Sequence, residues 1–524
     1  MNICDSDHPN CRLGVDGSLV EEPPQLPTRV IDVGGEGQPP RLIISNGVRS
    51  NYMTLSHCWG SSRWVATTTE SLPRMMERFD LDAIPKTYAD AIIVTRRLGV
   101  QYLWIDSFCI IQDDRDDWFA ESTRMGDIYE KAYCNIAATG AVDGTTGFLA
   151  AGGEEPTHVR MSTSKGESDS FYLTNQPNSD FSACVSETKL NSRGWVMQER
   201  LLSRRTIHFA ADMWYWECGE YVISEDGWHH DTRGALSNST ESLRNTLEGS
   251  VTAIGKSIRN HDGISTPYGG QDPNGLTAEQ TEVLWAQILR AYSKCDLTFF
   301  SDKLPALQGL AGTFKGVMKS TYSSGHWVPL GRPLPQSFMW AAARDGGLSF
   351  PEGKSSPSWS CLKGNGAVEF HDTHGTTPHM KVTHMSARTS SILLRGKVRK
   401  GKLAQPNGER PVRKPTFYSL SFNSITQYGT FVNSLGPARF DDAADVPKEV
   451  TLLLAYEKVP VRQYLNSQKD QLALVLREIE DTGAHEGDLD AHFEGVQRYE
   501  RVGIAFVNNH NFFHNVPTSS LILA

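Results

Sequence analysis

Two polar clusters follow short apolar runs of the chain, and their residue types could carry acid/base or nucleophilic chemistry. One is the SHCWG segment at 56–60, and the other is the DSFC segment at 106–109. His57 and Asp106 could transfer protons, while Cys58 and Cys109 could attack a substrate as thiolates. A lone cysteine beside a tryptophan is more often a small core residue, and a strand-terminal aspartate as often binds backbone N–H groups of the next loop.

Glu121 is the most informative single residue. It falls within the apolar stripe of a helix expected over about 114–132, a stripe made by Trp118, Met125, Ile128, Tyr129 and Ala132. If Asp114 caps this helix, Glu121 is too far along to belong to a capping box. It is then either a buried partner of an arginine, such as Arg193 or Arg200, or a catalytic carboxylate desolvated at the rim of a cleft.

Further candidates for binding a substrate come from the two polar clusters, from the helix expected over about 114–132 and from residues 193–200. Arg193, Glu199 and Arg200 could form an ion-pair network that orders the site. Tryptophans could stack on a flat ligand, although most buried tryptophans fill space. The complete set of candidate substrate-binding residues is Ser56, Trp59, Trp104, Trp118, Arg193, Trp195, Gln198 and Glu199.

An alternation of strands and helices is expected to position these residues. Residues 52–56, 101–106 and 134–139 are typical of buried strands, and the helix over 114–132 precedes the third of them. Another helix begins at Pro85 and ends at Gly99, with Tyr88 on its apolar face and Asp90 pointing away. This order predicts a parallel sheet with right-handed crossovers, whose ligands bind outside the carboxyl ends of the strands.

The remaining chain suggests four regions. Residues 1–50 are an arm with one β-like run at 41–45, residues 51–220 an α/β core, residues 221–275 a polar insertion or connection, and residues 276–524 a mostly β region packed on the core. The core is expected to end with a short helix over 195–202 and a hairpin of 206–209 with 213–217. Within the last region, a helix over 278–295 precedes short aromatic runs such as 337–343, 358–363, 417–422 and 451–456.

Composition excludes several classes of protein. The 524 residues carry 51 Lys plus Arg against 61 Asp plus Glu, and this net charge of -10 argues against nucleic-acid binding. Nine scattered cysteines without a C-x-x-C pair indicate reduced thiols in a cell interior. The start lacks a signal-peptide pattern, and no run approaches 18 apolar residues, so we expect a cytoplasmic protein that does not bind membranes.

Cofactor and metal signals are weak. The sequence has no dinucleotide fingerprint, phosphate loop, H-E-x-x-H or G-x-S-x-G motif. Cys4, His8 and Cys11 have the types and spacing of metal ligands, but the neighbourhood names no fourth ligand for a structural zinc. We therefore expect neither a metal ion nor a cofactor. The expected partner is a small-molecule ligand or nucleotide, and homo-oligomerisation is left open.

Three motifs resemble those of fungal heterokaryon incompatibility (HET) domain proteins. These are YMTLSHCWG at 52–60, LWIDSFCIIQ at 103–112 with the downstream Trp118 and Glu121, and RGWVMQER at 193–200. The segments at 4–11, 26–33, 302–311 and 357–361 are similar to flanking parts of full-length members. Many members carry Tyr at the position of His57, which departs from the family pattern.

This resemblance implies a role in non-self recognition and regulated cell death, and a fold of the TIR or flavodoxin type. Several TIR domains cleave the nicotinamide N-glycosidic bond of NAD, using a glutamate that follows a Trp on a helix after a sheet strand. Trp118 and Glu121 are similar in order and spacing. Three hypotheses follow: a nucleotide N-glycosidase, a biosynthetic cyclase, lyase or acyl-transfer enzyme using the same cleft, and a non-catalytic signalling module.

Overall fold

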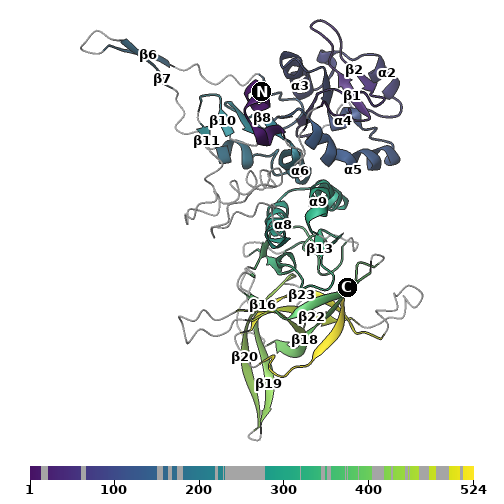
Figure 1. Ribbon diagram of the computed structural model, residues 1–524, viewed down its shortest axis with the longest axis vertical. Helices are drawn as coiled ribbons and strands as arrows, with labels where there is room; N and C mark the ends of the chain where they lie inside the picture. The colour runs from purple at the N-terminus through teal and green to yellow at the C-terminus, as the bar shows by residue number, and fades with distance from the viewer. Residues whose placement is uncertain are drawn as a thin grey trace. The chain divides into compact units, whose positions relative to one another are not determined.

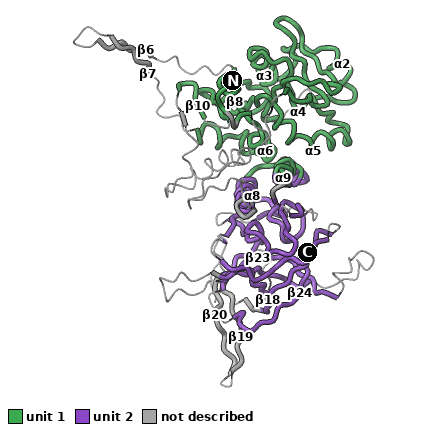
Figure 2. The backbone as a smooth tube through the Cα atoms, viewed as in Figure 1, with its two compact units in different colours: residues 1–276, 295–298, 305–313 green, residues 277–294, 299–304, 314–524 purple. Residues whose placement is uncertain are grey.

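The chain forms two compact units, seen in a computed structural model (Figures 1 and 2). Unit 1 comprises Met1–Leu276, Cys295–Thr298 and Pro305–Thr313, and unit 2 comprises Thr277–Lys294, Phe299–Leu304 and Phe314–Ala524. The structure describes residues 1–12, 20, 22–60, 66–149, 157–162, 168–173, 181–218, 222–227, 229–230, 278–318, 320–343, 348–350, 356–371, 373, 376–386, 389–403, 418–426, 429–442, 447, 449–458, 471–479, 495–507 and 512–524.

A nine-stranded sheet is the framework of unit 1. Its order is β11-β10-β9-β8-β5-β3-β4-β1-β2. In this order the strands are His229–His230, Val222–Ser224, Trp214–Cys218, Arg205–Phe209, Cys134–Ala137, Tyr52–Ser56, Tyr102–Trp104, Arg29–Asp32 and Arg41–Ile44. The four central strands, β4, β3, β5 and β8, run parallel, and all other neighbours are antiparallel.

The predicted α/β class is confirmed, but the sheet is mixed rather than parallel throughout. β1 and β2 form a hairpin that lies at one edge, and β1 pairs with β4 through Ile31 and Asp32. Val30 and Ile31 are fully buried, so part of the first 50 residues belongs to the core of unit 1. The alternation of strands and helices indicated only the parallel centre, because a hairpin that adds to a sheet edge leaves no such pattern.

Helices connect these strands. The described ones in unit 1 before β8 are α1 (Asn2–Ser6), α2 (Leu72–Glu77), α3 (Lys86–Arg97), α4 (Asp106–Cys109), α5 (Arg115–Lys131) and α6 (Gly194–Leu202), with the short helices η1 (Pro9–Arg12), η2 (Leu81–Ala83) and η3 (Ser182–Ser186). Asp114 caps α5 by accepting hydrogen bonds from the amides of Asp116 and Asp117. Gly99, at φ +72°, follows α3 as its sequence predicted.

Asp90 of α3 corrects the prediction that this side chain points to solvent. It is 1% exposed and accepts hydrogen bonds from the amides of Phe148 and Leu149 at 2.8 and 3.1 Å. Lys86 Nζ lies 2.7 Å from its other carboxylate oxygen. A carboxylate with these donors is stable when buried, and it holds the segment after β5 against α3.

Unit 2 contains a second, largely antiparallel nine-stranded sheet. Its path is β16-β21-β22-β23-β20-β19-β18-β17, with β24 pairing with β18 and β23. In chain order, β16 to β24 are Thr376–Pro378, Met380–Met385, Ile392–Leu403, Tyr418–Thr426, Gly429–Phe440, Glu449–Lys458, Gln471–Glu478, Arg498–Val507 and Thr518–Leu523. This confirms the predicted β-rich region, although the expected run at 358–363 forms turns around the buried Trp359 and Cys361.

Smaller elements complete the description. Helix α8 (Ala278–Tyr292) and η5 (Phe300–Lys303) belong to unit 2, while residues of α9 (Pro305–Met318) belong to both units. Two-stranded sheets are formed by β6 (Thr157–Ser162) with β7 (Ser168–Leu173), β12 (Thr321–Ser323) with β13 (His326–Val328), and β14 (Trp340–Ala342) with β15 (Val368–Phe370). The short helix η6 (Gln336–Phe338) precedes β14.

Two glycines of unit 1 allow α5 and the first part of α9 to approach closely. A Cβ placed on Gly126 would lie 2.8 Å from the Cα of Gly309, and one placed on Gly309 would lie 2.3 Å from Gln198 Oε1. We expect Gly126→Ala to lower the free energy of unfolding of unit 1 by about 1–3 kcal/mol, because the contacting atom is backbone and one helix must move. Chemical denaturation of this variant beside Gly312→Ala, where a Cβ meets nothing within 4 Å, provides the test. Equal losses in the two variants would contradict the packing argument.

Candidate functional site

The two polar clusters meet at the carboxyl ends of β3 and β4. The strands are parallel neighbours in which Thr54 is opposite Trp104, so the residues after both strands lie at one edge of the sheet. Trp59 Nε1 donates to Asp106 Oδ2 at 3.0 Å, and the amide of Ser107 donates to Asp106 Oδ1 at 2.7 Å. The Asp106 side chain is 20% exposed, so solvent reaches it.

His57 lies behind Asp106 as a neutral ring. Its Nε2 is 2.9 Å from the Tyr88 hydroxyl and 3.9 Å from Asp106 Oδ1. Burial lowers the pKa of His57 to about 4, and the nearby Arg193 lowers it further, against the opposing effect of Asp106. At neutral pH this imidazole is therefore uncharged and a weak base, better suited to orienting neighbours than to accepting a proton.

Glu199 brings the third motif to the same place. This carboxyl belongs to α6, is 4% exposed, and has one oxygen, Oε2, without a hydrogen-bond partner among the described residues. Burial raises the pKa of Glu199 to about 7, although the Ser56 hydroxyl, Arg193 and the Tyr129 hydroxyl each lower it. A carboxyl that titrates near neutral pH inside a polar cluster is typical of general acid/base groups.

Arg193 links α6 to the end of β3. It precedes the first residue of α6, and its guanidinium donates a short hydrogen bond to the carbonyl oxygen of His57. Its charge also lowers the pKa of Glu199. Arg193 therefore holds the first and third motifs together and favours the ionised form of Glu199.

Ser56 joins a network between β3 and β5. Its hydroxyl lies 3.0 Å from Asn135 Nδ2, and Thr54 Oγ1 lies 3.1 Å from Asn135 Oδ1. Tyr129 donates from its hydroxyl to the carbonyl of Leu55 at 3.1 Å. Sequence reasoning missed Asn135, Tyr129 and Tyr88 as site residues, since each lay in an apolar run or on an apolar helix face that indicated only core packing.

Glu121 is buried, as its place in the apolar stripe of α5 predicted, but it has other partners. Its Oε1 accepts from Thr28 Oγ1 at 2.6 Å and lies 3.6 Å from Arg124 Nη1, while its Oε2 has no partner among the described residues. The predicted pairing of a buried Glu121 with an arginine is confirmed, but the partner is Arg124 rather than Arg193 or Arg200. Within the described part of the chain, no hydrogen bond or ion pair connects Glu121 with Ser56, Asp106 or Glu199.

The predicted ion-pair trio of the third motif is also arranged differently. Arg200 Nε lies 2.9 Å from Glu217 Oε2 on β9, and Arg200 Nη1 donates to Ser186. His208 Nε2 lies 2.8 Å from the same carboxylate oxygen of Glu217. Arg200 therefore forms a buried ion pair with Glu217. Glu199 has no direct ion-pair partner among the described residues.

Both cysteines of the first two motifs lie in surroundings that disfavour a thiolate. Cys58 packs with Ala137, Leu190 and Val196, and burial raises its pKa despite the nearby Arg193. Cys109 is fully buried, and burial raises its pKa far above the ordinary value. Nucleophilic cysteines have lowered pKa values and partial exposure, so these thiols offer little support for covalent catalysis.

The other candidate binding residues divide between the site and the core. Trp59 reaches Asp106, and its ring stacks parallel to His57 with centroids 6.3 Å apart. Trp104 is fully buried against Tyr129, while Trp118 and Trp195 are half-buried beside the core of unit 1. Gln198 faces Gly309, and its side-chain amide has no partner among the described residues. Among these tryptophans, Trp59 contacts Asp106 directly, and Trp104 contacts the network through Tyr129.

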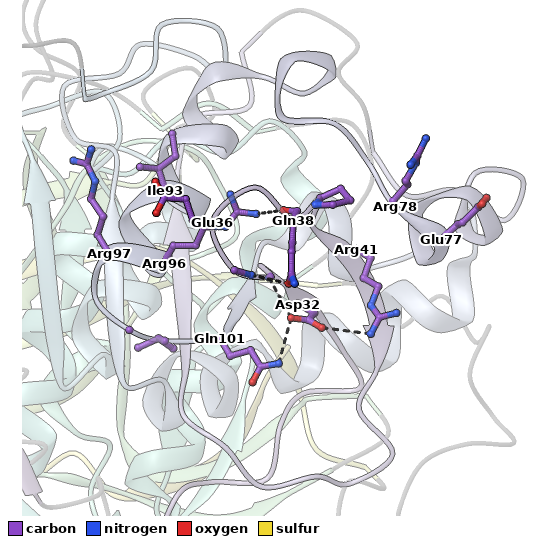
Figure 3. Close-up of a pocket in the computed structure, with 15 residues that line it drawn as sticks. Asp32, Glu36, Gln38, Arg41, Glu77, Arg78, Ile93, Arg96, Arg97 and Gln101 are labelled. Atoms are coloured by element: carbon purple, nitrogen blue, oxygen red, sulfur yellow. Dashed lines mark hydrogen bonds and ion pairs between the residues drawn. The ribbon is translucent and has the colours of Figure 1, made fainter.

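A surface pocket of about 970 Å³ lies at the other end of β4 (Figure 3). Asp32 is central to its polar lining, accepting from Gly34 N at 3.2 Å and lying 3.6 Å from Arg41 Nη2. Gln101, at the amino end of β4, also lines it, as do several arginines. None of the predicted site residues lines this pocket. Because α/β sheets bind ligands at the carboxyl ends of their strands, the polar cluster remains the candidate site.

The fold and the site define an α/β domain with a polar cluster at the carboxyl edge of its central parallel strands. Residues 52–199 match the family model described as heterokaryon incompatibility protein (HET). Residues 52–199 therefore form a HET domain, which confirms the resemblance of the three motifs. The matched segment includes every predicted site residue, with Glu199 at its end.

Two further comparisons, with curated proteins and with solved structures, were also made. No curated protein and no solved structure matches the chain. Among the helices that the structure describes, none combines the length and apolar character needed to cross a membrane.

Proposed function

We propose that the HET domain is a nucleotide N-glycosidase that cleaves the nicotinamide–ribose bond of NAD, with Glu199 as the carboxylate that faces the ribose. The observation that carries this proposal is the position of Glu199. Its pKa is raised to about 7 by burial, one carboxylate oxygen has no partner among the described residues, and Ser56 and Arg193 influence its ionisation. Such a group exchanges protons readily at physiological pH.

The order of the parallel strands supports a ligand site at this edge. In chain order β3, β4, β5 and β8 are the first to fourth parallel strands, so their spatial order is 2-1-3-4. Flavodoxin-like sheets have the order 2-1-3-4-5 and bind their ligands at the switch point between the first and third strands. Ser56 on β3 and Asn135 on β5 flank the corresponding point here.

The resemblance to TIR domains also fits Glu199 in residue order, with four residues from Trp195 to Glu199 against three from Trp118 to Glu121. The catalytic glutamate of those domains follows a Trp on a helix after a sheet strand. Trp195 and Glu199 on α6 satisfy this description, as do Trp118 and Glu121 on α5. Electrostatics favour the first pair, because Glu199 belongs to the cluster with Ser56 and Arg193, whereas Glu121 is bonded to Thr28 and Arg124.

The chemistry requires stabilisation of a cationic sugar. Cleavage of the bond between ribose C1′ and the nicotinamide nitrogen sends the bonding electron pair to the departing nicotinamide, which leaves as a neutral molecule. Ionised Glu199 would stabilise the oxocarbenium-like transition state and then accept a proton from the water that adds to C1′. Trp59 supplies a flat ring for stacking on nicotinamide, and Asp106 and Ser56 shape the site.

A direct assay tests the proposal. Full-length purified protein, alone and fused to a tetramerising domain, is incubated with millimolar NAD, and the products are separated by liquid chromatography. We expect equimolar nicotinamide and ADP-ribose, formed faster by the tetrameric fusion. If NAD stays intact with both forms at high protein concentration, the glycosidase proposal is wrong.

A non-catalytic signalling module is the second candidate, and the low exposure of the cluster favours it. Ser56 is 1% exposed and Glu199 4% exposed, so a ligand must displace part of the present surface to reach them. Under this alternative the polar cluster stabilises a docking surface, and Glu199→Gln would change partner binding without any turnover to lose. The biosynthetic alternative has less support, because its thiol version requires ionisation of Cys58 or Cys109.

A further inference from the structure

Four potential metal ligands of unit 1 converge at the end of β9. Cys4 belongs to α1, His8 follows it, Cys11 belongs to η1, and Cys218 is the last residue of β9. Their ligand atoms all lie within 4.8 Å of one another, and all four residues are buried. Cys218 lies 210 residues after His8 in the chain. The sequence of the first twelve residues therefore indicated only three of the four ligands.

Three of four distances between the ligand atoms match the edges of a tetrahedron around zinc, and the fourth is shorter. Zn–S bonds of about 2.3 Å and Zn–N bonds of about 2.0–2.1 Å place tetrahedral ligand atoms about 3.6–3.8 Å apart. His8 Nδ1 lies 3.2 Å from Cys4 Sγ, 3.8 Å from Cys11 Sγ and 3.7 Å from Cys218 Sγ. Cys4 Sγ and Cys11 Sγ are 3.6 Å apart, far beyond the about 2.05 Å of a disulfide bond.

We propose that Cys4, His8, Cys11 and Cys218 bind one structural Zn²⁺ ion. Three thiolates and one imidazole form a Cys₃His set, and this soft, tetrahedral set selects zinc among the common divalent ions. Four protein ligands leave no open position, so the ion supports the fold rather than catalysis. The presence of this ion does not depend on whether the HET domain cleaves nucleotides.

Arg205 provides the charge that such a site requires. Three thiolates around Zn²⁺ carry a net charge of -1, and burying that charge without a counterion is costly. The Arg205 side chain is buried, lies 2.5 Å from Asp5 Oδ1, and donates to the carbonyl of Cys11 at 3.4 Å. Its guanidinium also lies over the Tyr133 ring, whose hydroxyl donates to Asp5 Oδ2 at 2.6 Å. These contacts form an outer shell that fixes α1 and η1.

The ion would fasten the first twelve residues to β9. Arg205 and Tyr133 make polar contacts with this segment, and Met1 packs against the core of unit 1. A helix as short as α1 is not stable by itself in water. Metal binding therefore accounts for an ordered start of the chain, and its removal should release residues 1–12 without unfolding the sheet.

Metal analysis of the full chain tests the proposal. Protein expressed with added zinc and washed with a weak chelator is expected to hold about one Zn²⁺ per chain by elemental mass spectrometry. Replacement by Co²⁺ should produce the d–d bands of a tetrahedral site and thiolate-to-metal charge-transfer bands. In hydrogen exchange, a strong chelator should deprotect residues 1–12 and leave the amides of β3 and β5 unchanged.

Variants separate this site from other cysteines. Cys218→Ser is expected to weaken zinc binding by more than the 10- to 100-fold that loss of an outer-shell partner costs, and His8→Ala should act similarly. His8→Cys preserves four ligands and should retain the ion. Cys184→Ser, which changes a half-buried cysteine outside the cluster, is the matched control. If Cys218→Ser does not fold, Cys4→Ser and Cys11→Ser replace it, because they lie outside the sheet.

Three outcomes would overturn the zinc site. The first is a chain that holds no zinc and gives no tetrahedral Co²⁺ spectrum. The second is full metal retention in Cys218→Ser together with Cys4→Ser. The third is a disulfide between two of the three cysteines in the purified protein, detected as two thiols that alkylate only after reduction.

Discussion

Glu199→Gln is expected to reduce NAD cleavage by at least about 100-fold while leaving the HET domain folded. Glutamine fills the same volume but can neither carry the negative charge nor accept a proton, and such groups contribute typically 10²- to 10⁴-fold to a rate. Steady-state kinetics with NAD measure the loss, and hydrogen exchange of β3 and β5 reports folding. Retention of more than a tenth of the wild-type rate would exclude Glu199 as the catalytic carboxylate.

The same variant also has a pH signature in stability, which follows from the burial of Glu199 and does not depend on a catalytic role. The raised pKa means that the folded state favours protonated Glu199, so wild-type stability is full below about pH 4.5 and falls as the pH rises toward 7. A shift from 4.5 to about 7 corresponds to about 3 kcal/mol. Glu199→Gln should therefore match wild type near pH 4.5 and be more stable by up to that amount at pH 8. Denaturation series at both pH values provide the measurement.

Glu121→Gln is the matched control, because Glu121 is equally buried but bonded to Thr28 and Arg124. We expect this change to lower NAD cleavage less than tenfold. A loss from Glu121→Gln as large as that expected from Glu199→Gln, with Glu199→Gln active, would assign catalysis to α5 instead. Asp106→Asn is expected to lie between the two, because Asp106 positions Trp59 and faces solvent.

Much of the unit 1 sheet could be predicted because its central strands are short, apolar and bounded by clear signals. The expected strand over 52–56 is β3 itself, and the expected hairpin corresponds to β8 and β9. The expected β-like run at 41–45 is β2, but its hairpin with β1 and the pairing of β1 with β4 could not be predicted, since pairing between distant segments leaves no local pattern. Asp90 shows the same limit, because its buried donors come from Phe148 and Leu149, far along the chain.

The candidate site, like the sheet, could be predicted from the sequence only in part. Residue type and strand position were enough to place Ser56, His57 and Asp106 at the carboxyl edge of the sheet. They favoured Glu121 as the catalytic carboxylate and gave Glu199 only a binding or ion-pair role, because both are carboxylates on helices and only their neighbours distinguish them. Cys218 could not be predicted as a metal ligand either, since its partners lie in the first twelve residues.

Glu217→Ala is expected to destabilise unit 1 by about 3–5 kcal/mol, which is the largest stability effect we expect from a single substitution. Glu217 is buried on β9, and its carboxylate accepts from both Arg200 and His208. Its removal leaves the buried guanidinium of Arg200 without its ion-pair partner. Hydrogen exchange of amides in β8 and β9 measures the loss, because it reports unfolding of this unit separately from unit 2.

The pH dependence of this pair has the opposite sign to that of Glu199. Burial raises the pKa of Glu217, but Arg200 and His208 outweigh it and hold the pKa well below its usual range. The stabilisation is therefore present above the unfolded pKa of about 4.5 and is lost as the pH falls below it. In Glu217→Ala this acid-induced loss should disappear.

Removing both charges separates the ion pair from the packing around it. Arg200→Leu combined with Glu217→Leu leaves no buried charge, and such replacements of ion pairs by apolar residues are often neutral. The remaining destabilisation comes from His208. Its ring loses its hydrogen-bond partner, which lowers the free energy of unfolding by about 1–3 kcal/mol. The double variant should therefore be more stable than Glu217→Ala. If it is less stable, the pair contributes net stability, and Arg200 holds α6, and with it Glu199, against the sheet through its charge.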